Sequence, residues 1–277
     1  MVMNDPVARA LAHLRGCRTQ GVADELYPIT LNFHPDIAID GKLVIDLLAQ
    51  HRIYRSQFET GTSSGELSVH PSGNRWNWES RIFGGAYDES HQSLRPKYGA
   101  LNYCLDPVGG SRRFGSCHLR LLQRVRSRTS FCYPDSHLEP HHFAVDDVRP
   151  LVALASDNRL ALDPWLDNYI EAHIHGPLSM VDDVDAVVLD PSFRGTSIEE
   201  VADSLGCGVE WHNGFRLPVE RIAECEVYRG PVAASTIIRI AEDKVVTPAI
   251  LGHARDRLLD YQTAKWVWHC IARFGHE

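Results

Sequence analysis

The segment NYIEAHIHG (168–176) combines a carboxylate and two imidazoles at a spacing that could support catalysis. Successive side chains of a β-strand point to opposite faces, so the polar residues here would share one face: Tyr169, Glu171, His173 and His175. Such a face is costly to bury unless it lines a cleft, although an edge strand can simply turn its polar face to water. The segment is our first candidate for a functional site.

Two kinds of chemistry fit this strand face. In the first, Glu171 is a catalytic carboxylate on the floor of a cleft. In the second, His173 and His175 bind a metal ion, because a His-x-His pair on a strand places both rings on one side. The third ligand would come from elsewhere in the chain: His118, His137, His141 or His142. A metal site at His173 and His175 would make the protein a metal-dependent hydrolase.

The stretch from Val108 to Pro134 contains six arginines and no acidic residue. It could be an ordinary solvated face, or the rim of a site for an anionic ligand, since the planar guanidinium pairs well with phosphate oxygens. It also supports a third hypothesis, a non-enzymatic module that binds an acidic partner. The arginines are Arg112, Arg113, Arg120, Arg124, Arg126 and Arg128.

Hydrophobic periodicity predicts the elements that position these residues. Helices are expected at 5–16, 41–51, 197–205 and 248–274, and strands at 114–122, 128–133, 168–176, 186–189, 209–214 and 235–243. Residues 71–110 show little periodicity and are predicted to form a long ordered loop, anchored by Trp76 and Trp78. Strands in the middle and helices at the ends favour an α+β fold, in a single domain over 1–277.

Composition narrows the classes of protein that fit. The chain has 277 residues, 44% of them hydrophobic, and a net charge of 28 − 36 = −8, which argues against a dedicated nucleic-acid binder. No apolar run is long enough for a membrane span, and no secretory signal peptide is visible. Seven cysteines without a CxxC pair indicate reduced thiols and no structural metal. We expect a cytoplasmic protein, or a secreted or delivered effector without a classical signal peptide.

Several segments, over about 30–215, resemble a bacterial family catalogued as a domain of unknown function. These segments are IYRSQFETGTSSG (53–65), RPKYGALNY (95–103), SRRFGSCHLRL (111–121), SRTSFCYPDS (127–136) and YIEAHIHGPLSMVDDVDAVVLDPSFRG (169–195). Their order also resembles the toxin-type ADP-ribosyltransferases of the Arg-Ser-Glu class. That resemblance implies an ADP-ribosyltransferase-like mixed β core with flanking helices, in which 216–277 would add a strand and a long C-terminal helix.

The resemblance implies roles for three residues: Arg55, Ser116 and Glu171, with Thr129 and Ser130 as alternatives to Ser116. NAD would be the substrate, and ADP-ribose would pass to a protein or small acceptor, or to water. Glu171 would stabilise the cation that forms when the nicotinamide–ribose bond breaks, and Ser116 would fix the rotamer of Glu171.

Other residues would hold NAD or serve the acceptor. Arg55 would bind the ribose edge or the pyrophosphate, and an aromatic ring would stack on nicotinamide. The candidates for contacts with NAD are Arg55, Tyr54, Phe58, Tyr98, Arg113, Thr129 and Ser130. Arginine-modifying members carry Glu or Gln two residues before the catalytic Glu, where this chain has Tyr169. We therefore expect an acceptor other than arginine, with His173 as the base.

Overall fold

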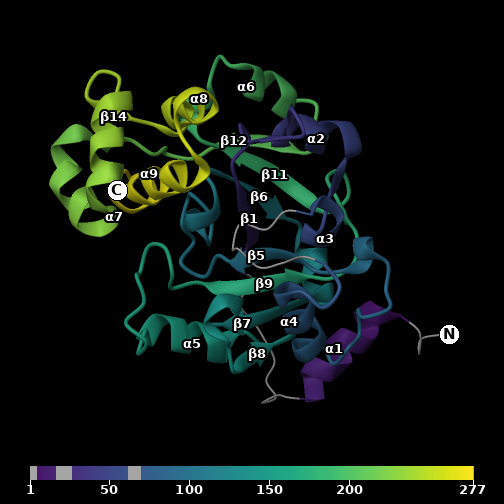
Figure 1. The fold of residues 1–277 in the computed structure, drawn as a ribbon. Coiled ribbons are helices and arrows are strands. Elements are labelled where there is room, and N and C mark those ends of the chain that lie inside the picture. The colour runs from purple at the N-terminus through teal and green to yellow at the C-terminus, as the bar shows by residue number, and fades with distance from the viewer. Residues whose placement is uncertain (1–4, 17–26, 62–69, 277) are drawn as a thin grey trace.

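The computed structural model describes residues 5–16, 27–61 and 70–276. An eight-stranded sheet forms its centre, in the order β12-β11-β6-β1-β5-β9-β7-β8 (Figure 1). Neighbouring strands are antiparallel except β11 and β12, which are parallel. The strands are β1 (Ile29–Phe33), β5 (Lys97–Leu101), β6 (Cys117–Leu121), β7 (Thr129–Tyr133), β8 (His142–Ala144), β9 (Ile170–Ile174), β11 (Val184–Leu189) and β12 (Gly208–Trp211). The predicted α+β class is confirmed.

Three short pairs of strands and a set of helices surround this sheet. The pairs are β2 (Ala38–Ile39) with β3 (Lys42–Leu43), β4 (Ile53–Tyr54) with β10 (Leu178–Ser179), and β13 (Leu217–Pro218) with β14 (Val245–Val246). The helices are α1 (Pro6–Gly16), α2 (Val44–His51), α3 (Gln57–Thr60), α4 (Asn74–Ile82), α5 (Arg149–Asp157), α6 (Ser197–Ala202), α7 (Ile222–Ile240), α8 (Pro248–Leu258) and α9 (Tyr261–Phe274). None of these described helices is both long and apolar enough to cross a membrane.

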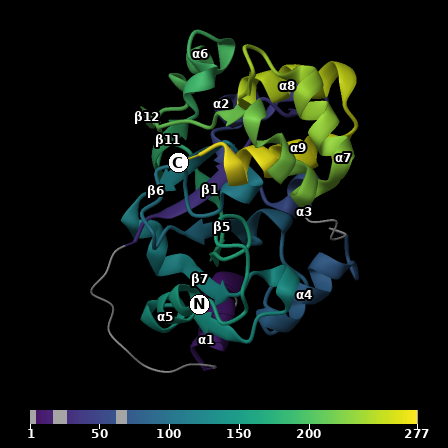
Figure 2. The ribbon, with the colours of Figure 1, turned by 90° about the vertical axis from the view of Figure 1, so that its left-hand side faces the viewer.

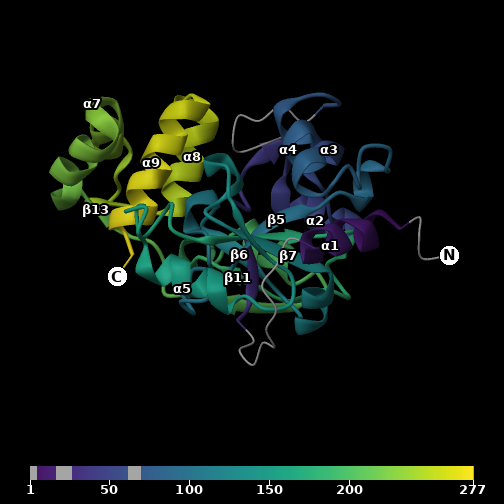
Figure 3. The ribbon, with the colours of Figure 1, turned by 90° about the horizontal axis from the view of Figure 1, so that it is seen from below.

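The sheet has one apolar and one polar face. Apolar strand residues such as Leu31, Leu119 and Ile170 form the main core with α2, α5 and α6. On the opposite face, α1 and α4 form a smaller cluster over the β7–β9 part of the sheet. Seen from below, α3 and α4 stand on the same side of the sheet (Figure 3). The polar face of β9 therefore lies under α4 and not in open solvent.

The last three helices form a third cluster with its own apolar centre, around Phe215, Ile237 and Trp268. Figures 1 and 2 show α7–α9 gathered at the end of the molecule opposite α1. The prediction of a strand at 235–243 and one long helix at 248–274 is wrong. Buried residues in α7 follow helical spacing against α9, and Asp260 caps a new helix by accepting a hydrogen bond from the backbone N–H of Thr263, 2.9 Å away.

The predicted loop at 71–110 is also wrong, because it contains α4 and β5. The buried face of α4 carries Arg75, Trp78 and Glu79, which follow helical i, i+3, i+4 spacing. Two of these three residues are charged, so hydropathy showed no helical period. Trp78 does anchor this segment, since it packs against Phe83.

Strand β9 occupies an interior position of the sheet, between β5 and β7. The alternative that its polar face belongs to a solvent-facing edge strand is therefore wrong. His173 and His175 have no exposed surface, and Glu171 keeps 6% of its surface. A buried carboxylate with two buried imidazoles needs polar partners to offset the loss of hydration.

Candidate active site around Glu171

A chain of hydrogen bonds runs across the polar face of β7 and β9 and ends at Glu171. Tyr87 Oη lies 2.7 Å from His175 Nδ1, and His175 Nε2 lies 2.8 Å from Ser130 Oγ. Ser130 Oγ lies 3.1 Å from His173 Nδ1, and His173 Nε2 lies 3.0 Å from Glu171 Oε1. We call these five residues the Tyr87–Glu171 chain.

The second carboxylate oxygen of Glu171 is held from the other side. Ser136 Oγ donates to Glu171 Oε2 at 3.0 Å, and Arg75 Nη1 donates to Ser136 Oγ at 3.1 Å. The guanidinium of Arg75 lies 4.3 Å from the centre of the Tyr98 ring and 5.5 Å from that of Trp78. Cation–π contacts of this kind help to keep a buried cation in place.

A buried ion pair supports this arrangement from behind. Arg95 donates to Glu79 Oε2 at 2.6 Å, and Tyr98 Oη donates to Glu79 Oε1 at 2.7 Å. The side chains of Arg95 and Glu79 are only 4% and 1% exposed. Since Tyr98 also lies under the Arg75 guanidinium, this pair fixes the ring on which Arg75 rests.

The register of the sheet explains why these residues meet. Ser130 pairs with His173 and Cys132 pairs with Glu171 across β7 and β9, while Tyr98 on β5 pairs with His173 from the other side. Directly paired residues of adjacent strands project to the same face. Helix α4 then covers this face with its charged side.

The carboxylate of Glu171 is held in its ionised form. Burial by itself raises its pKa, but the hydrogen bond from His173, the charge of Arg75 and the hydroxyl of Ser136 outweigh burial, and the pKa lies below its usual range. His175 behaves differently, because burial, together with the positive charges of Arg128 and Lys97, holds its pKa well below the usual value, so this ring is neutral. The buried anion of Glu171 near the buried cation of Arg75 is an arrangement typical of functional sites.

Three buried polar atoms beside Glu171 have no hydrogen-bond partner among the described residues: Arg75 Nε, Trp78 Nε1 and Asp135 Oδ1. Leaving a buried donor or acceptor unsatisfied costs roughly 1–3 kcal/mol, so native proteins rarely do so without a reason. Asp135 adjoins Ser136 in sequence, and its other oxygen accepts from Tyr169 Oη at 2.7 Å. These two donors and one acceptor belong to residues next to the site, since Arg75 binds Ser136, Trp78 contacts the His173 ring and Asp135 precedes Ser136.

Ser116 does not have the predicted role toward Glu171. It lies just before β6, and β1 and β5 stand between β6 and β9. Its hydroxyl lies 3.4 Å from His34 Nδ1. The neighbouring Gly115 is needed for close packing, because a Cβ there would lie 2.1 Å from the backbone carbon of Phe33. Ser136 holds Glu171 directly.

Among the alternatives to Ser116, one belongs to the site and one does not. Ser130 is part of the Tyr87–Glu171 chain, whereas Thr129 Oγ1 donates to the backbone oxygen of Val125 at 2.9 Å. Thr129 points to the opposite face of β7 from Ser130, as strand alternation requires.

The predicted aromatic and arginine contacts are only partly brought together. Tyr98 lies in the site, but its ring face is covered by Arg75, so it is not free to stack on nicotinamide. Phe58 is covered by the guanidinium of Arg95 at 4.2 Å. Tyr54 and the exposed Arg55 belong to β4 and its end, and β4 pairs with β10 rather than with β9.

His173 is placed behind Glu171 and does not face an acceptor. Its ring is fully buried, and both nitrogens already have partners in Ser130 and Glu171. Since both nitrogens are engaged within the Tyr87–Glu171 chain, the structure gives no support to the prediction that His173 acts as the base toward the acceptor. Its position makes it a support for Glu171.

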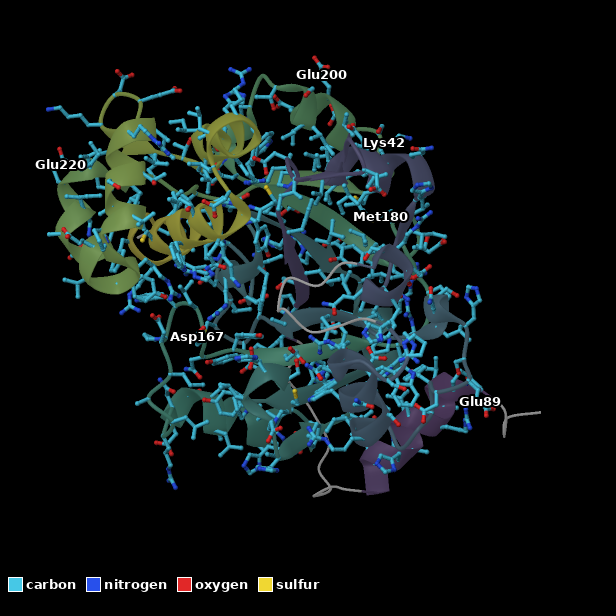
Figure 4. All side chains as sticks on the ribbon, viewed as in Figure 1. Lys42, Glu89, Asp167, Met180, Glu200 and Glu220 are labelled. Atoms are coloured by element: carbon cyan, nitrogen blue, oxygen red, sulfur yellow. The ribbon has the colours of Figure 1, made fainter. Side chains whose placement is uncertain are left out.

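The arginine-rich segment is largely neutralised by carboxylates. Arg113 pairs with Asp167, which Figure 4 shows on the side of the molecule below the C-terminal helices. The ion pairs are Arg112–Asp106, Arg113–Asp167, Arg120–Asp185, Arg120–Glu210, Arg124–Asp183 and Arg128–Asp183. Charge that is already paired offers little to an acidic partner, and Arg113 is not directed at Glu171.

The histidine face does not provide the metal site that we considered. Both nitrogens of His175 have partners in Tyr87 and Ser130. The ligand atoms of Cys132, Glu171 and His173 do lie within 4.8 Å of one another. However, burial and the charge of Glu171 raise the pKa of the Cys132 thiol well above its usual value, and Arg75 adds a positive charge. A dication would have to displace the thiol proton and bind beside the positive charge of Arg75, which opposes its binding here.

We therefore expect the purified protein to contain no stoichiometric zinc. Elemental analysis after purification without chelator checks this directly. About one zinc per chain, lost in a Cys132→Ala, His173→Gln double variant but kept in a Cys104→Ala variant at the exposed cysteine, would overturn it.

The lowered pKa of Glu171 predicts a specific dependence of stability on pH. A carboxyl whose folded-state pKa is depressed stabilises the fold above its unfolded pKa of roughly 4.3, and this contribution is lost as the pH falls through the folded value. Wild-type protein should therefore lose more stability between about pH 6 and pH 3 than Glu171→Gln, which has no such proton to bind. Urea midpoints at the two pH values measure this, and equal losses would contradict it.

Several residues of the site were missed at the sequence level: Arg75, Glu79, Tyr87, Arg95, Cys132 and Ser136. A usable signal was present in RWNWE (75–79), where Arg75, Trp78 and Glu79 have the spacing of one helix face. The partners of that face could be assigned only once α4 was seen to lie over β9.

Comparison with known protein families identifies where the chain belongs. A family model described as "Protein of unknown function (DUF3626)" matches residues 28–159 and 151–274, which together cover most of the chain. The chain therefore belongs to this family, which confirms the first of the two resemblances. No curated protein matches it.

Proposed function

For this member of the DUF3626 family, we propose an NAD-consuming activity of the ADP-ribosyltransferase type. The protein cleaves the bond between nicotinamide and ribose and transfers ADP-ribose to a protein or small-molecule acceptor, or to water. The observation that carries the proposal is the buried, ionised carboxylate of Glu171, set among polar atoms that lack partners.

The chemistry requires an anion of this kind. Cleavage of a glycosidic bond to ribose passes through an oxocarbenium-like state, and nicotinamide leaves as a neutral molecule, so no strong general acid is needed. A fixed carboxylate stabilises the positive charge that develops at the anomeric carbon. Oε1 of Glu171 accepts from His173 and from the Cys132 thiol, whereas Oε2 accepts only from Ser136 among the described residues, which leaves a lone pair on Oε2 for a ribose hydroxyl.

The unpartnered atoms fit the polar groups of such a substrate. Arg75 Nε and Trp78 Nε1 are donors that a ribose, amide or phosphate oxygen satisfies, and Asp135 Oδ1 is an acceptor for a hydroxyl. Arg75 takes the place that we first assigned to Arg55, because Arg75 is buried beside Glu171. Binding energy from these contacts also orients the ribose.

The acceptor side is bordered by Tyr169 rather than by a carboxylate or amide two residues before Glu171. Tyr169 is 4% exposed, and its hydroxyl is bound to Asp135. A phenol at this position does not orient a guanidinium as a carboxylate does. We therefore propose that the acceptor is not arginine. Identifying the product that carries ADP-ribose distinguishes transfer to an acceptor from hydrolysis.

We expect Arg75→Lys to weaken NAD binding by about tenfold, while Arg55→Lys leaves it unchanged. Lysine keeps the charge but lacks the planar fork and the Nε–H group, and the loss of one charge-assisted hydrogen bond corresponds to about 1.5 kcal/mol. Calorimetry with NAD measures both affinities, and release of labelled nicotinamide by the wild type reports the activity. Equal affinities for wild type and Arg75→Lys, or no nicotinamide release by the wild type, would contradict the proposal.

A further inference from the structure

The far end of the Tyr87–Glu171 chain is a buried hydroxyl with a clear partner. Tyr87 has no exposed surface, and its ring stacks on His175 with centroids 5.9 Å apart and planes inclined by 8°. Burial, followed by the negative charge of Glu79, raises the pKa of Tyr87 far above the usual range, so the phenol keeps its proton. The hydroxyl has no other hydrogen-bond partner among the described residues, so we assign that proton to the bond with His175 Nδ1, 2.7 Å away.

The direction of every following hydrogen bond is then determined. His175 is neutral and accepts at Nδ1, so its single proton is on Nε2 and is donated to Ser130 Oγ. Ser130 accepts this bond, and its own proton is directed to His173 Nδ1. A nitrogen that accepts cannot carry a proton, so the proton of His173 is on Nε2 and is donated to Glu171.

We propose that Tyr87 is a positioning residue that acts through His175 and Ser130 to keep His173 singly protonated, as a neutral donor to Glu171. A second proton at His173 Nδ1 would meet the proton of Ser130, which has nowhere else to point while His175 donates to it. His173 therefore orients Glu171 by a hydrogen bond without neutralising it as an imidazolium would. The charge of Glu171 stays available to a cationic transition state.

None of the other described groups around His173 contacts its Nδ1 atom, so none of them sets the protonation of that nitrogen. Glu171 on its own strand and the Cys132 thiol on β7 both lie at the Nε2 side, at 3.0 and 3.7 Å. The rings of Tyr98 from β5 and Trp78 from α4 contact the imidazole face or edge, with centroids 5.6 and 5.5 Å away. Among the charged groups, Arg75 acts on Glu171 at one end of the chain, and Arg128 and Lys97 act on His175.

Removing the hydroxyl of Tyr87 should reverse the direction of the hydrogen bonds between His175, Ser130 and His173. In Tyr87→Phe, His175 is free to move its proton to Nδ1 and to accept at Nε2 from Ser130. Ser130 then turns its proton toward His175 and can accept from His173 Nδ1–H. His173 becomes able to bind a second proton and to form an imidazolium beside Glu171. No atom in direct contact with His173 has been changed.

Nitrogen NMR of protein labelled at histidine distinguishes these states, because protonated and bare imidazole nitrogens have different chemical shifts. The His173 signals are assigned by their loss in His173→Gln. We expect Nδ1 of His173 to be bare in the wild type and to carry a proton in Tyr87→Phe under the same conditions. Tyr133→Phe is the matched control, since Tyr133 donates to Asn168 and lies outside the chain.

Two results would overturn the inference: an imidazolium at His173 in the wild type at neutral pH, or identical His173 signals in the wild type and Tyr87→Phe. If Tyr87→Phe does not fold, Ser130→Ala interrupts the next link, and Nδ1 of His173 should lose its hydrogen-bonded shift. A Ser130→Ala spectrum unchanged at His173 also overturns the inference.

A kinetic experiment extends the inference to catalysis and rests on the proposed function. We expect Tyr87→Phe to lower kcat for nicotinamide release roughly tenfold with KM unchanged, while Tyr133→Phe keeps the wild-type values. Wild-type protein without NAD turnover would remove the proposed function but leave the NMR result to stand on its own. Full kcat in Tyr87→Phe would overturn the catalytic part of the inference.

Discussion

Replacing Glu171 by glutamine should reduce NAD turnover by roughly 100-fold or more, about 3 kcal/mol of transition-state stabilisation, and leave the fold intact. The amide fits the site because its oxygen can accept from His173 while its NH₂ group donates to Ser136, whose oxygen is an acceptor. The shape and most hydrogen bonds survive, but the negative charge is lost. The variant should therefore lose mainly the stabilisation of the positive charge that develops at the anomeric carbon.

The measurement is the release of labelled nicotinamide at saturating NAD, with circular dichroism and a thermal melt to show that the variant is folded. Glu89→Gln is the matched control, because Glu89 is exposed and lies near the N-terminal helix, away from the site (Figure 4). A folded Glu171→Gln protein with wild-type turnover would remove Glu171 from the mechanism and with it the proposed function.

Replacing Arg95 by methionine should destabilise the protein by about 3–5 kcal/mol. The change leaves Glu79, whose side chain is only 1% exposed, without its ion-pair partner and with only the charge of Arg75 nearby. Burial already raises the pKa of Glu79 above its usual value despite hydrogen bonds from Tyr98 and Arg95. Without Arg95 the carboxylate must either take up a proton or lose the structure around it. Urea unfolding followed by tryptophan fluorescence gives the free energy.

Two comparisons make this prediction specific. Arg15→Met breaks the exposed pair with Asp146, whose side chains are 46% and 53% exposed, and should cost less than about 1 kcal/mol. The double variant Arg95→Met, Glu79→Gln removes the orphaned charge and should recover part of the loss. Equal costs for Arg15→Met and Arg95→Met would show that the buried pair is not important for stability.

The sequence by itself determined the elements whose local pattern is regular. The alternation in 168–176 predicted β9 and the shared face of Glu171 and His173, and helical spacing predicted α1. These predictions depend only on neighbours within a few residues, because strand and helix periods are fixed by backbone geometry. Where the buried side of an element is charged, as in α4 with Arg75 and Glu79, the same reasoning finds no period and predicts a loop.

Only the tertiary structure decided which residues act on Glu171. Ser116, Ser130 and Ser136 lie in the same stretch of the chain, yet only Ser130 and Ser136 join the site, through the register of β7 against β9 and the turn that follows β7. Tyr87 and His175 are 88 positions apart and still form one hydrogen bond. Such contacts arise when the core closes and neighbouring strands are fixed in register, so they are properties of the packed sheet and of the helix that covers it.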